Sequence, residues 1–233
     1  GAGAYSRLYN YARLGVTYVT AEERAARSDV RSRIYLYFGG ITGRVYAGNS
    51  LENCENHAEV ALVFLRDGEP CDAQEIYDYQ KAFAPNSEHW NLPRYIGGIA
   101  GTNQGLVKDC LSLCGDYGTI QEELDSYADA VNLRELGYVG GYVGGLIGSN
   151  EGTLLFTDAL FAGQDTGIMQ VVVKAFCYSN GGLVGHASTK GIIRNEGPII
   201  KMQGVVASQG NPMPQGQMQI ESTGGVAGYI AGG

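Results

Sequence analysis

The sequence predicts an all-β chain whose short strands stack as coils. One observation is a repeat: the pattern Gly-Gly-aliphatic-x-Gly occurs five times, and repeats separated by tens of residues are typical of solenoids, propellers and arrays. The other is composition: glycine supplies 36 of the 233 residues, and a hydrophobic fraction of 44% argues against disorder. The repeat glycines, to which we assign a structural role, are Gly39, Gly40, Gly43, Gly97, Gly98, Gly101, Gly144, Gly145, Gly148, Gly181, Gly182, Gly185, Gly224, Gly225 and Gly228.

The similarity between copies continues past the third glycine. Residues 101–110, 148–158 and 185–195 resemble one another, and 43–54 follows them more loosely. Each copy predicts a short aliphatic strand, a Gly/Asn turn, a second short strand and a polar corner. We expect Asn-x-Gly to supply left-handed backbone, and the paired glycines to let neighbouring coils approach closely. The aliphatic residue should point into an interior that only stacked units can bury.

The spacing between copies is irregular, at 58, 47, 37 and 43 residues. A propeller blade of fixed length would not vary this much, whereas coils that carry loop insertions would. We therefore expect an N-terminal cap or first coils over 1–38, followed by a repeat-containing β-solenoid over 39–233. The longest insertion is expected at about 55–94.

Segments between the repeats also carry structural signals. Strand-like runs cover 59–65, 167–176 and 199–206. A capping box, with Thr20 followed by Glu23, predicts a short helix over 20–27, and a second short helix is expected over 119–133. Both helices would decorate a β body.

The repeats resemble a known family. The pattern Gly-Gly-Leu-Val-Gly-x-Asn-x-Gly-x-Ile-x-Asn-Cys is similar to the GLUG-type repeats of bacterial secreted and surface proteins, which include adhesin-like chains and IgA-cleaving metallopeptidases. The best matches are 97–110 and 144–158, then 181–195, then 39–54, whereas 224–228 is only the opening of a copy. The resemblance implies an all-β, right-handed parallel β-helix-like solenoid that is exported from a bacterial cell. It implies no catalytic residues, because the repeat is structural.

The charge distribution argues against nucleic acid as a partner. The net charge of −8 divides into about +4 over 1–44, −11 over 45–136 and −1 over 137–233. Phosphate binding needs clustered Lys and Arg, and the arginines of the N-terminal segment are interleaved with acids.

The cysteine pattern and the absence of catalytic motifs from the sequence predict that the protein has no cofactor. The five cysteines are Cys54, Cys71, Cys110, Cys114 and Cys177, an odd count that cannot form a closed disulfide framework. We interpret Cys110 and Cys114 as buried thiols in preference to a zinc pair. No H-E-x-x-H, P-loop, G-x-S-x-G or calcium-binding repeat occurs, so we expect no metal and no enzyme activity.

Carboxylates near the repeat corners offer one enzymatic interpretation. Glycoside hydrolysis needs two carboxylates, and some β-helix enzymes place them on an exposed coil face. Corner Asp residues more commonly bond the backbone of turns, and we favour that role. The residues concerned are Asp109, Asp116, Asp158 and Asp165.

Aromatic residues of the insertion are the predicted ligand-binding group. Exposed aromatic rings stack on sugars or anchor protein partners. The alternative is that they cover an open end of the solenoid, where unpaired strand edges invite aggregation. The candidates are Tyr77, Tyr79, Trp90 and Tyr95, with Phe83 and His89 nearby.

These observations together favour a non-catalytic adhesive or structural module on the bacterial cell surface or outside the cell. It would bind a glycan or protein through its loops. Two alternatives stay open: an accessory stalk or exosite domain of a large secreted metallopeptidase, and a polysaccharide-active β-helix enzyme. We expect no transmembrane segment, because the uncharged stretch 136–150 is short of the roughly 20 apolar residues that a span needs. A repeat that only opens at 224–228 suggests a piece of a longer polypeptide.

Overall fold

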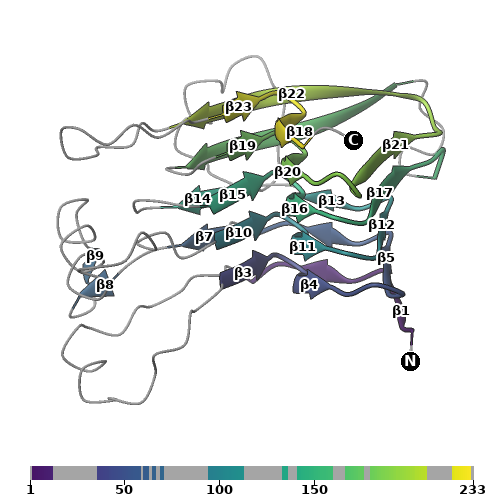
Figure 1. The fold of residues 1–233 in the computed structure, drawn as a ribbon, viewed down its shortest axis with the longest axis horizontal. Coiled ribbons are helices and arrows are strands. Elements are labelled where there is room, and N and C mark those ends of the chain that lie inside the picture. Colours follow the sequence, from purple (N-terminus) through teal and green to yellow (C-terminus); the bar gives the residue numbers. More distant parts are fainter. Residues whose placement is uncertain are drawn as a thin grey trace.

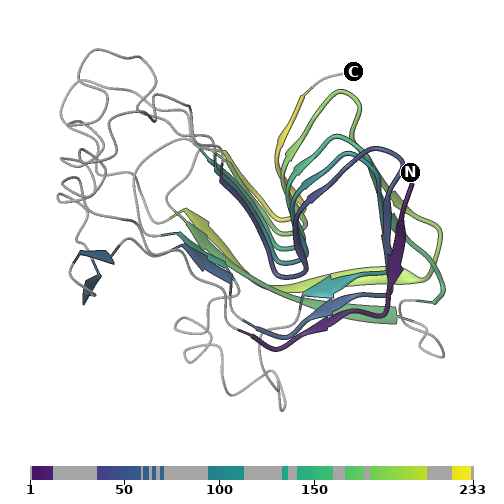
Figure 2. The ribbon, with the colours of Figure 1, turned by 90° about the horizontal axis from the view of Figure 1, so that it is seen from below.

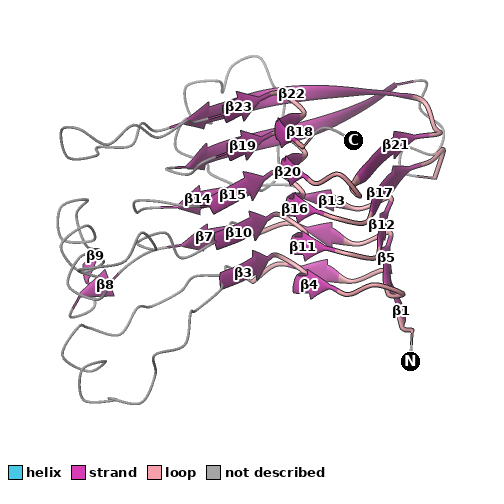
Figure 3. Ribbon diagram, viewed as in Figure 1, coloured by secondary structure: helices cyan, strands magenta, loops and turns pink. Residues whose placement is uncertain are grey.

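The computed structural model describes residues 2–12, 36–58, 60–62, 65–66, 69–70, 94–112, 133–135, 141–159, 166–175, 179–208 and 222–231. Within these ranges the chain is all β and contains no helix (Figure 3). Five sheets are parallel, and one two-stranded antiparallel ribbon pairs β8 (Leu65–Arg66) with β9 (Glu69–Pro70).

Each of two five-stranded sheets takes one strand from every repeat. The first sheet holds β3 (Leu36–Gly39), β10 (Arg94–Gly97), β15 (Gly141–Gly144), β19 (Ser179–Gly181) and β23 (Ser222–Gly224). The second sheet holds β4 (Thr42–Val45), β11 (Ala100–Asn103), β16 (Ile147–Asn150), β20 (Val184–Ala187) and β24 (Ala227–Ile230).

Three further parallel sheets hold the other strands of the stack. The third sheet holds β1 (Ala4–Ser6), β5 (Ser50–Glu52), β12 (Leu106–Lys108), β17 (Thr153–Phe156) and β21 (Ile192–Asn195). The fourth holds β2 (Tyr9–Asn10), β6 (Glu55–Asn56) and β13 (Leu111–Ser112). The fifth holds β7 (Val60–Leu62), β14 (Leu133–Glu135), β18 (Thr166–Ala175) and β22 (Ile199–Ser208).

The chain visits the sheets in the same order on each pass, and successive passes lie side by side (Figure 1). The passes that contain β17 and β21 go from the third sheet to the fifth with no described strand in the fourth. The repeat glycines align: Gly97 pairs with Gly39 on one side and Gly144 on the other. Gly144 pairs in turn with Gly181, and Gly181 with Gly224. The irregular spacings of the repeats in sequence are therefore the numbers of residues in successive passes of the chain. This parallel, all-β arrangement is compatible with the predicted β-helix-like fold.

The paired glycines form a tight bend between the first and second sheets, which appears as the U of nested ribbons in Figure 2. A Cβ at Gly97 would collide with the carbonyl oxygen of Ala100 across the bend. A Cβ at Gly98 would collide with the carbonyl oxygen of Gly145 in the next pass and with the hydroxyl of Ser112 on the fourth sheet. The prediction that paired glycines permit close approach is confirmed.

The core lies between this bend and the remaining sheets. Ile99, Leu146 and Leu183, the aliphatic residues of the three middle repeats, are buried as predicted. Val226, the equivalent residue of the last repeat, is 50% exposed because no described strand covers it. The predicted inward orientation thus holds where a following pass exists.

One prediction about the turns is wrong. Among the described residues, left-handed backbone occurs at the corners after the third sheet, at Arg7, Asn53 and Asp109, and also at Gly48 in the turn of the first copy. It does not occur in the Asn-x-Gly turns at 103–105 and 150–152. In the turn, the Asn103 side chain accepts a hydrogen bond from the N–H of Gly105 at 3.0 Å and donates to Asn150 at 2.9 Å. The asparagine acts through side-chain bonds of the kind that stabilise Asx turns.

The glycine of the Asn-x-Gly turn serves close approach. A Cβ at Gly105 would collide with the carbonyl oxygen of Asn49, and one at Gly152 with that of Gly105. Neighbouring passes touch here through their backbones, so these two positions exclude a side chain although neither has a positive φ.

The remaining structural predictions have mixed outcomes. The strand-like runs 167–176 and 199–206 are largely β18 and β22. The helix expected over 20–27 lies outside the described residues, as does 119–132, but Leu133 begins strand β14 and is not helical. Where the structure describes the chain, no helix is long and apolar enough to cross a membrane.

The two regions set apart from the repeats both contribute to the parallel sheets. In the N-terminal region, β1 and β2 pair with β5 and β6. In the expected insertion, β6 and β7 pair with β13 and β14. These segments therefore continue the same stack.

Candidate functional site

A column of aromatic side chains runs along the stack on the two arms of the bend. Tyr37, Tyr95 and Tyr142 come from aligned positions of the first sheet. His186 and Tyr229 come from aligned positions of the second sheet. The backbone registers place these rings one pass apart, so each ring can stack on the next.

The stacking is continuous. The centroids of Tyr37 and Tyr95 lie 5.2 Å apart and those of Tyr95 and Tyr142 lie 5.6 Å apart. The column then crosses to the second sheet, where His186 lies 4.7 Å from Tyr142 and 5.5 Å from Tyr229. Such separations are typical of favourable aromatic pairs, each contributing about 0.5–1.5 kcal/mol beyond simple burial.

Arg44 extends the column at its N-terminal end. Its guanidinium carbon lies 4.5 Å from the ring centroid of Tyr37 and 4.7 Å from that of Tyr46. Among the described residues the buried Nε of Arg44 has no hydrogen-bond partner. The two rings lie within the distance at which cation–π attraction acts on this guanidinium.

His186 is the titratable member of the column. Its Nδ1 lies 3.0 Å from the hydroxyl of Ser149 on the neighbouring pass. Burial lowers the pKa of His186, and attraction to Glu151 partly opposes that effect. The neutral ring is therefore the favoured form between Tyr142 and Tyr229. Because its neighbours occupy the ring faces, the column is better suited to holding passes together than to stacking on a ligand.

A second aromatic group is more open to solvent. Tyr11 is 72% exposed and Tyr9 is 53% exposed, and both rings stack on His57, with centroids 4.7 Å and 6.4 Å away. The Nε2 of His57 lies 2.8 Å from a carboxylate oxygen of Glu55. We call these four residues the Tyr11 cluster.

The Tyr11 cluster is held by the backbone of the fourth sheet. The N–H of His57 donates to the carbonyl oxygen of Asn10 at 2.8 Å. The Asn10 side chain accepts from the N–H of Ala12 and donates to its carbonyl oxygen, both at 3.0 Å. These bonds fix the turn that carries Tyr11. The result is an exposed aromatic face beside a carboxylate, on a supported backbone.

The carboxylates expected at the repeat corners differ in their burial and in their hydrogen bonds. Asp109 is buried and accepts hydrogen bonds from both the N–H and the hydroxyl of Thr157, at 2.6 and 2.7 Å. The turn-stabilising role is confirmed for Asp109. Asp158 is exposed, and Asp116 and Asp165 lie outside the described residues.

Two of the cysteines are buried free thiols in adjacent passes. Cys54 and Cys110 are fully buried, which agrees with the predicted interpretation of Cys110. A hydrogen bond from the Cys110 thiol lowers the pKa of Cys54, and the same contact together with burial raises the pKa of Cys110. Cys71, Cys114 and Cys177 lie outside the described ranges. Within those ranges, no group of three or more His, Cys, Asp or Glu residues could hold a metal ion.

Of the predicted ligand-binding residues, only Tyr95 is described. It lies in strand β10 as part of the aromatic column, and not on a projecting loop. Tyr77, Tyr79 and Trp90 fall outside the described residues. The Tyr11 cluster was not predicted, because its members come from two short segments, 9–11 and 55–57, that only the pairing of β2 with β6 brings together.

Comparison with protein-family models, with curated proteins and with solved structures finds no match for this chain.

Proposed function

We propose that this chain is a non-catalytic β-solenoid module that binds an extracellular glycan or protein. The observation that carries the proposal is the Tyr11 cluster, in which a ring that is 72% exposed is stacked on His57 beside Glu55. Sugar rings and protein partners both use exposed aromatic faces, and a carboxylate accepts hydrogen bonds from hydroxyl groups. The similarity of the repeats to the GLUG type supports a bacterial surface or secreted setting.

The solenoid part of the proposal is supported by the passes themselves. Each pass adds one strand to the first and second sheets, with repeat glycines in register. Successive units that share one core in this way form a quasi-one-dimensional scaffold. Such a scaffold carries binding groups on its outside, where short segments such as residues 10–12 can be held rigidly.

The burial of Asp109 supports the non-catalytic part of the proposal. A catalytic carboxylate must reach a substrate, whereas Asp109 is 3% exposed and has both oxygens engaged with Thr157. Its burial and its corner position are those of a structural residue.

Screening the chain against an array of glycans and immobilised matrix proteins tests the proposal. For the strongest array ligand, Tyr11→Ala should raise the dissociation constant about tenfold, equivalent to about 1.4 kcal/mol. Tyr11→Phe keeps the ring and should keep most of the affinity. Tyr46→Ala removes a ring that is 55% exposed outside the cluster and serves as the control. Equal binding by the Tyr11→Ala variant and the unaltered chain, or no binding to any array member, would contradict the proposal.

A further inference from the structure

Cys54 and Cys110 occupy the same corner of two neighbouring passes. Before the corner β5 pairs with β12, and after the corner β6 pairs with β13. Two residues separate β5 from β6, and two separate β12 from β13, so the register does not change across the corner. The N–H of Leu111 also donates to the carbonyl oxygen of Cys54 at 2.9 Å. Cys54 therefore lies directly opposite Cys110.

The two side chains lie in contact. The Sγ of Cys110 is 3.7 Å from the carbonyl oxygen of Leu51, which belongs to the pass of Cys54, so the Cys110 thiol reaches towards that pass. The hydrogen bond between the two thiols lowers the pKa of Cys54 and raises the pKa of Cys110. The two sulfur atoms are therefore already neighbours.

The spacing of the passes suits a disulfide bond. Hydrogen-bonded strands lie about 4.8 Å apart, and the Cα atoms of disulfide-linked residues lie about 4.4–6.8 Å apart. The Cβ atoms of a disulfide lie at most about 4.5 Å apart, so the two corners need to approach by only about 0.5 Å. The backbone pairing of the two passes thus supplies the geometry that the bond requires.

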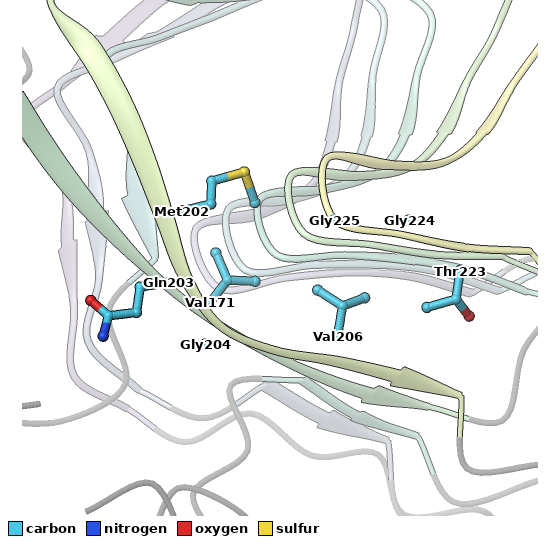
Figure 4. Close-up of a pocket in the computed structure, with 8 residues that line it drawn as sticks. All are labelled: Val171, Met202, Gln203, Gly204, Val206, Thr223, Gly224 and Gly225. Carbon is cyan, nitrogen blue, oxygen red and sulfur yellow. The ribbon is translucent and has the colours of Figure 1, made fainter. Parts of the chain in front are cut away.

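Burial determines when such a bond can form. Both cysteines are 0% exposed. A pocket of about 370 Å³ opens beside β22 and β23, but its lining, which includes Val171, Met202 and Gly225, contains neither cysteine (Figure 4). An oxidant must therefore react with the thiols before this corner closes, while the chain folds.

We propose that Cys54 and Cys110 form a disulfide bond between neighbouring passes when the chain folds in the presence of a small disulfide such as oxidised glutathione. The Cys54 thiolate attacks one sulfur of the oxidant and releases one glutathione thiolate. The Cys110 thiolate then attacks the Cys54 sulfur of the mixed disulfide and releases the second. One S–S bond breaks and one forms, and the two protons of the cysteine thiols pass to the two glutathione thiolates.

The bond would fasten the segment that carries part of the Tyr11 cluster. Glu55 follows Cys54 directly, and His57 stands three residues after it. A chain folded under reducing conditions keeps the two thiols, which is the form that the structure shows. The inference rests on the register of the sheets and not on ligand binding. The proposed extracellular setting would supply an oxidising environment, in which disulfides persist.

Oxidative refolding followed by peptide mapping tests the proposal. The full chain is reduced in urea, freed of reductant and refolded with a mixture of oxidised and reduced glutathione, after which free thiols are alkylated. Chymotrypsin cleaves after Leu111 and Leu113 and so separates Cys110 from Cys114. The Cys54 and Cys110 peptides should be joined. Their unlinked, alkylated forms should fall at least about tenfold relative to a sample refolded with reduced glutathione alone.

Two variants separate the folded register from chance encounters. Combining Cys71→Ser, Cys114→Ser and Cys177→Ser leaves only the proposed pair, and the bond should still form.

Combining Cys54→Ser with Glu55→Cys keeps the number of thiols but moves one of them from a buried to a partly exposed side-chain position. The link to Cys110 should then fall at least about tenfold, because adjacent side chains of an extended chain point to opposite faces.

Three results would overturn the proposal. One is that Cys54 and Cys110 both remain alkylated after oxidative refolding of the unaltered chain. Another is that either cysteine is linked mainly to Cys71, Cys114 or Cys177. The third is an equal yield of the link in the shifted variant. Binding of a glycan or protein by the Tyr11 cluster is measured separately with the Tyr11 variants, so either proposal can fail without the other.

Discussion

Asp109 is bonded through both carboxylate oxygens to a single residue of the next pass, Thr157. One oxygen accepts from the N–H of Thr157 at 2.6 Å and the other from its hydroxyl at 2.7 Å. Asp109 itself has a φ of 50°, the left-handed conformation that Asn and Asp tolerate better than most residues. One side chain therefore turns the chain and ties two passes together.

Replacing Asp109 should weaken the stack. Asp109→Ala removes the acceptor of two partly buried donors of Thr157 and places Ala in left-handed backbone, so we expect a loss of about 1–3 kcal/mol in the free energy of unfolding. Asp109→Asn keeps the backbone preference and one acceptor, and should lose about half as much. Urea unfolding measures both. A fully stable Asp109→Ala variant would show that the bonds to Thr157 are dispensable.

Two repeat glycines that occupy the same motif position should respond differently to a methyl group. Gly98→Ala forces a Cβ against Gly145 and Ser112, and should cost more than about 3 kcal/mol or prevent folding. Gly225→Ala meets no described atom within 4 Å and should change stability by less than about 0.5 kcal/mol in dilute solution. Thermal unfolding of both variants makes the comparison, and similar losses at the two positions would be inconsistent with these contacts.

His186 should make stability depend on pH. Its pKa is lowered from 6.5 by burial, so the unfolded chain binds the proton more readily than the folded chain. The contribution of His186 to stability is therefore complete above pH 6.5 and is lost as the pH falls through 6.5 towards the lower folded-state pKa. His186→Phe keeps an aromatic ring between Tyr142 and Tyr229 and removes this titration. The free energy of unfolding, measured at several pH values on both sides of pH 6.5, should depend less on pH in the variant than in the unaltered chain. The same pH dependence in both proteins would exclude His186 as its source.

The buried thiols should be inert in the folded chain. Contact with Cys110 lowers the pKa of Cys54, which favours the reactive thiolate, but neither side chain is exposed to solvent. Maleimide labelling followed by peptide mass spectrometry should find Cys54 and Cys110 unmodified under native conditions and fully modified in urea. Rapid native labelling of Cys54 would mean that this corner opens readily.

Much of the stack could be predicted from the spacing of the glycines. The number of residues between equivalent glycines equals the length of one pass. This holds because a glycine is needed wherever the backbone of one bend contacts the backbone of the next. The burial of Ile99 and Leu146 followed from the same pattern. The conformation of the Asn-x-Gly turns did not, because side-chain bonds of Asn103 and close backbone approach at Gly105 replace the expected left-handed residues.

The aromatic groups were harder to find. Tyr37, Tyr95 and Tyr142 all stand two positions before the first glycine of a repeat, a signal that alignment of the repeats contains. The step from Tyr142 to His186 crosses between sheets, so its prediction requires the shape of the bend. The Tyr11 cluster depends on the pairing of β2 with β6, two strands of two residues each, which are too short to leave a pattern in the sequence.

The parallel stack of passes is tested most directly by contacts of the Tyr95 ring. In a chain with labelled tyrosine rings, nuclear Overhauser effects report which protons lie close together. A stack in register predicts cross-peaks from Tyr95 to both Tyr37 and Tyr142, which are 58 and 47 residues away in sequence and have centroids at 5.2 and 5.6 Å. Cross-peaks to neither ring, or to only one of them, would contradict the alignment of passes on which the fold and both proposals depend.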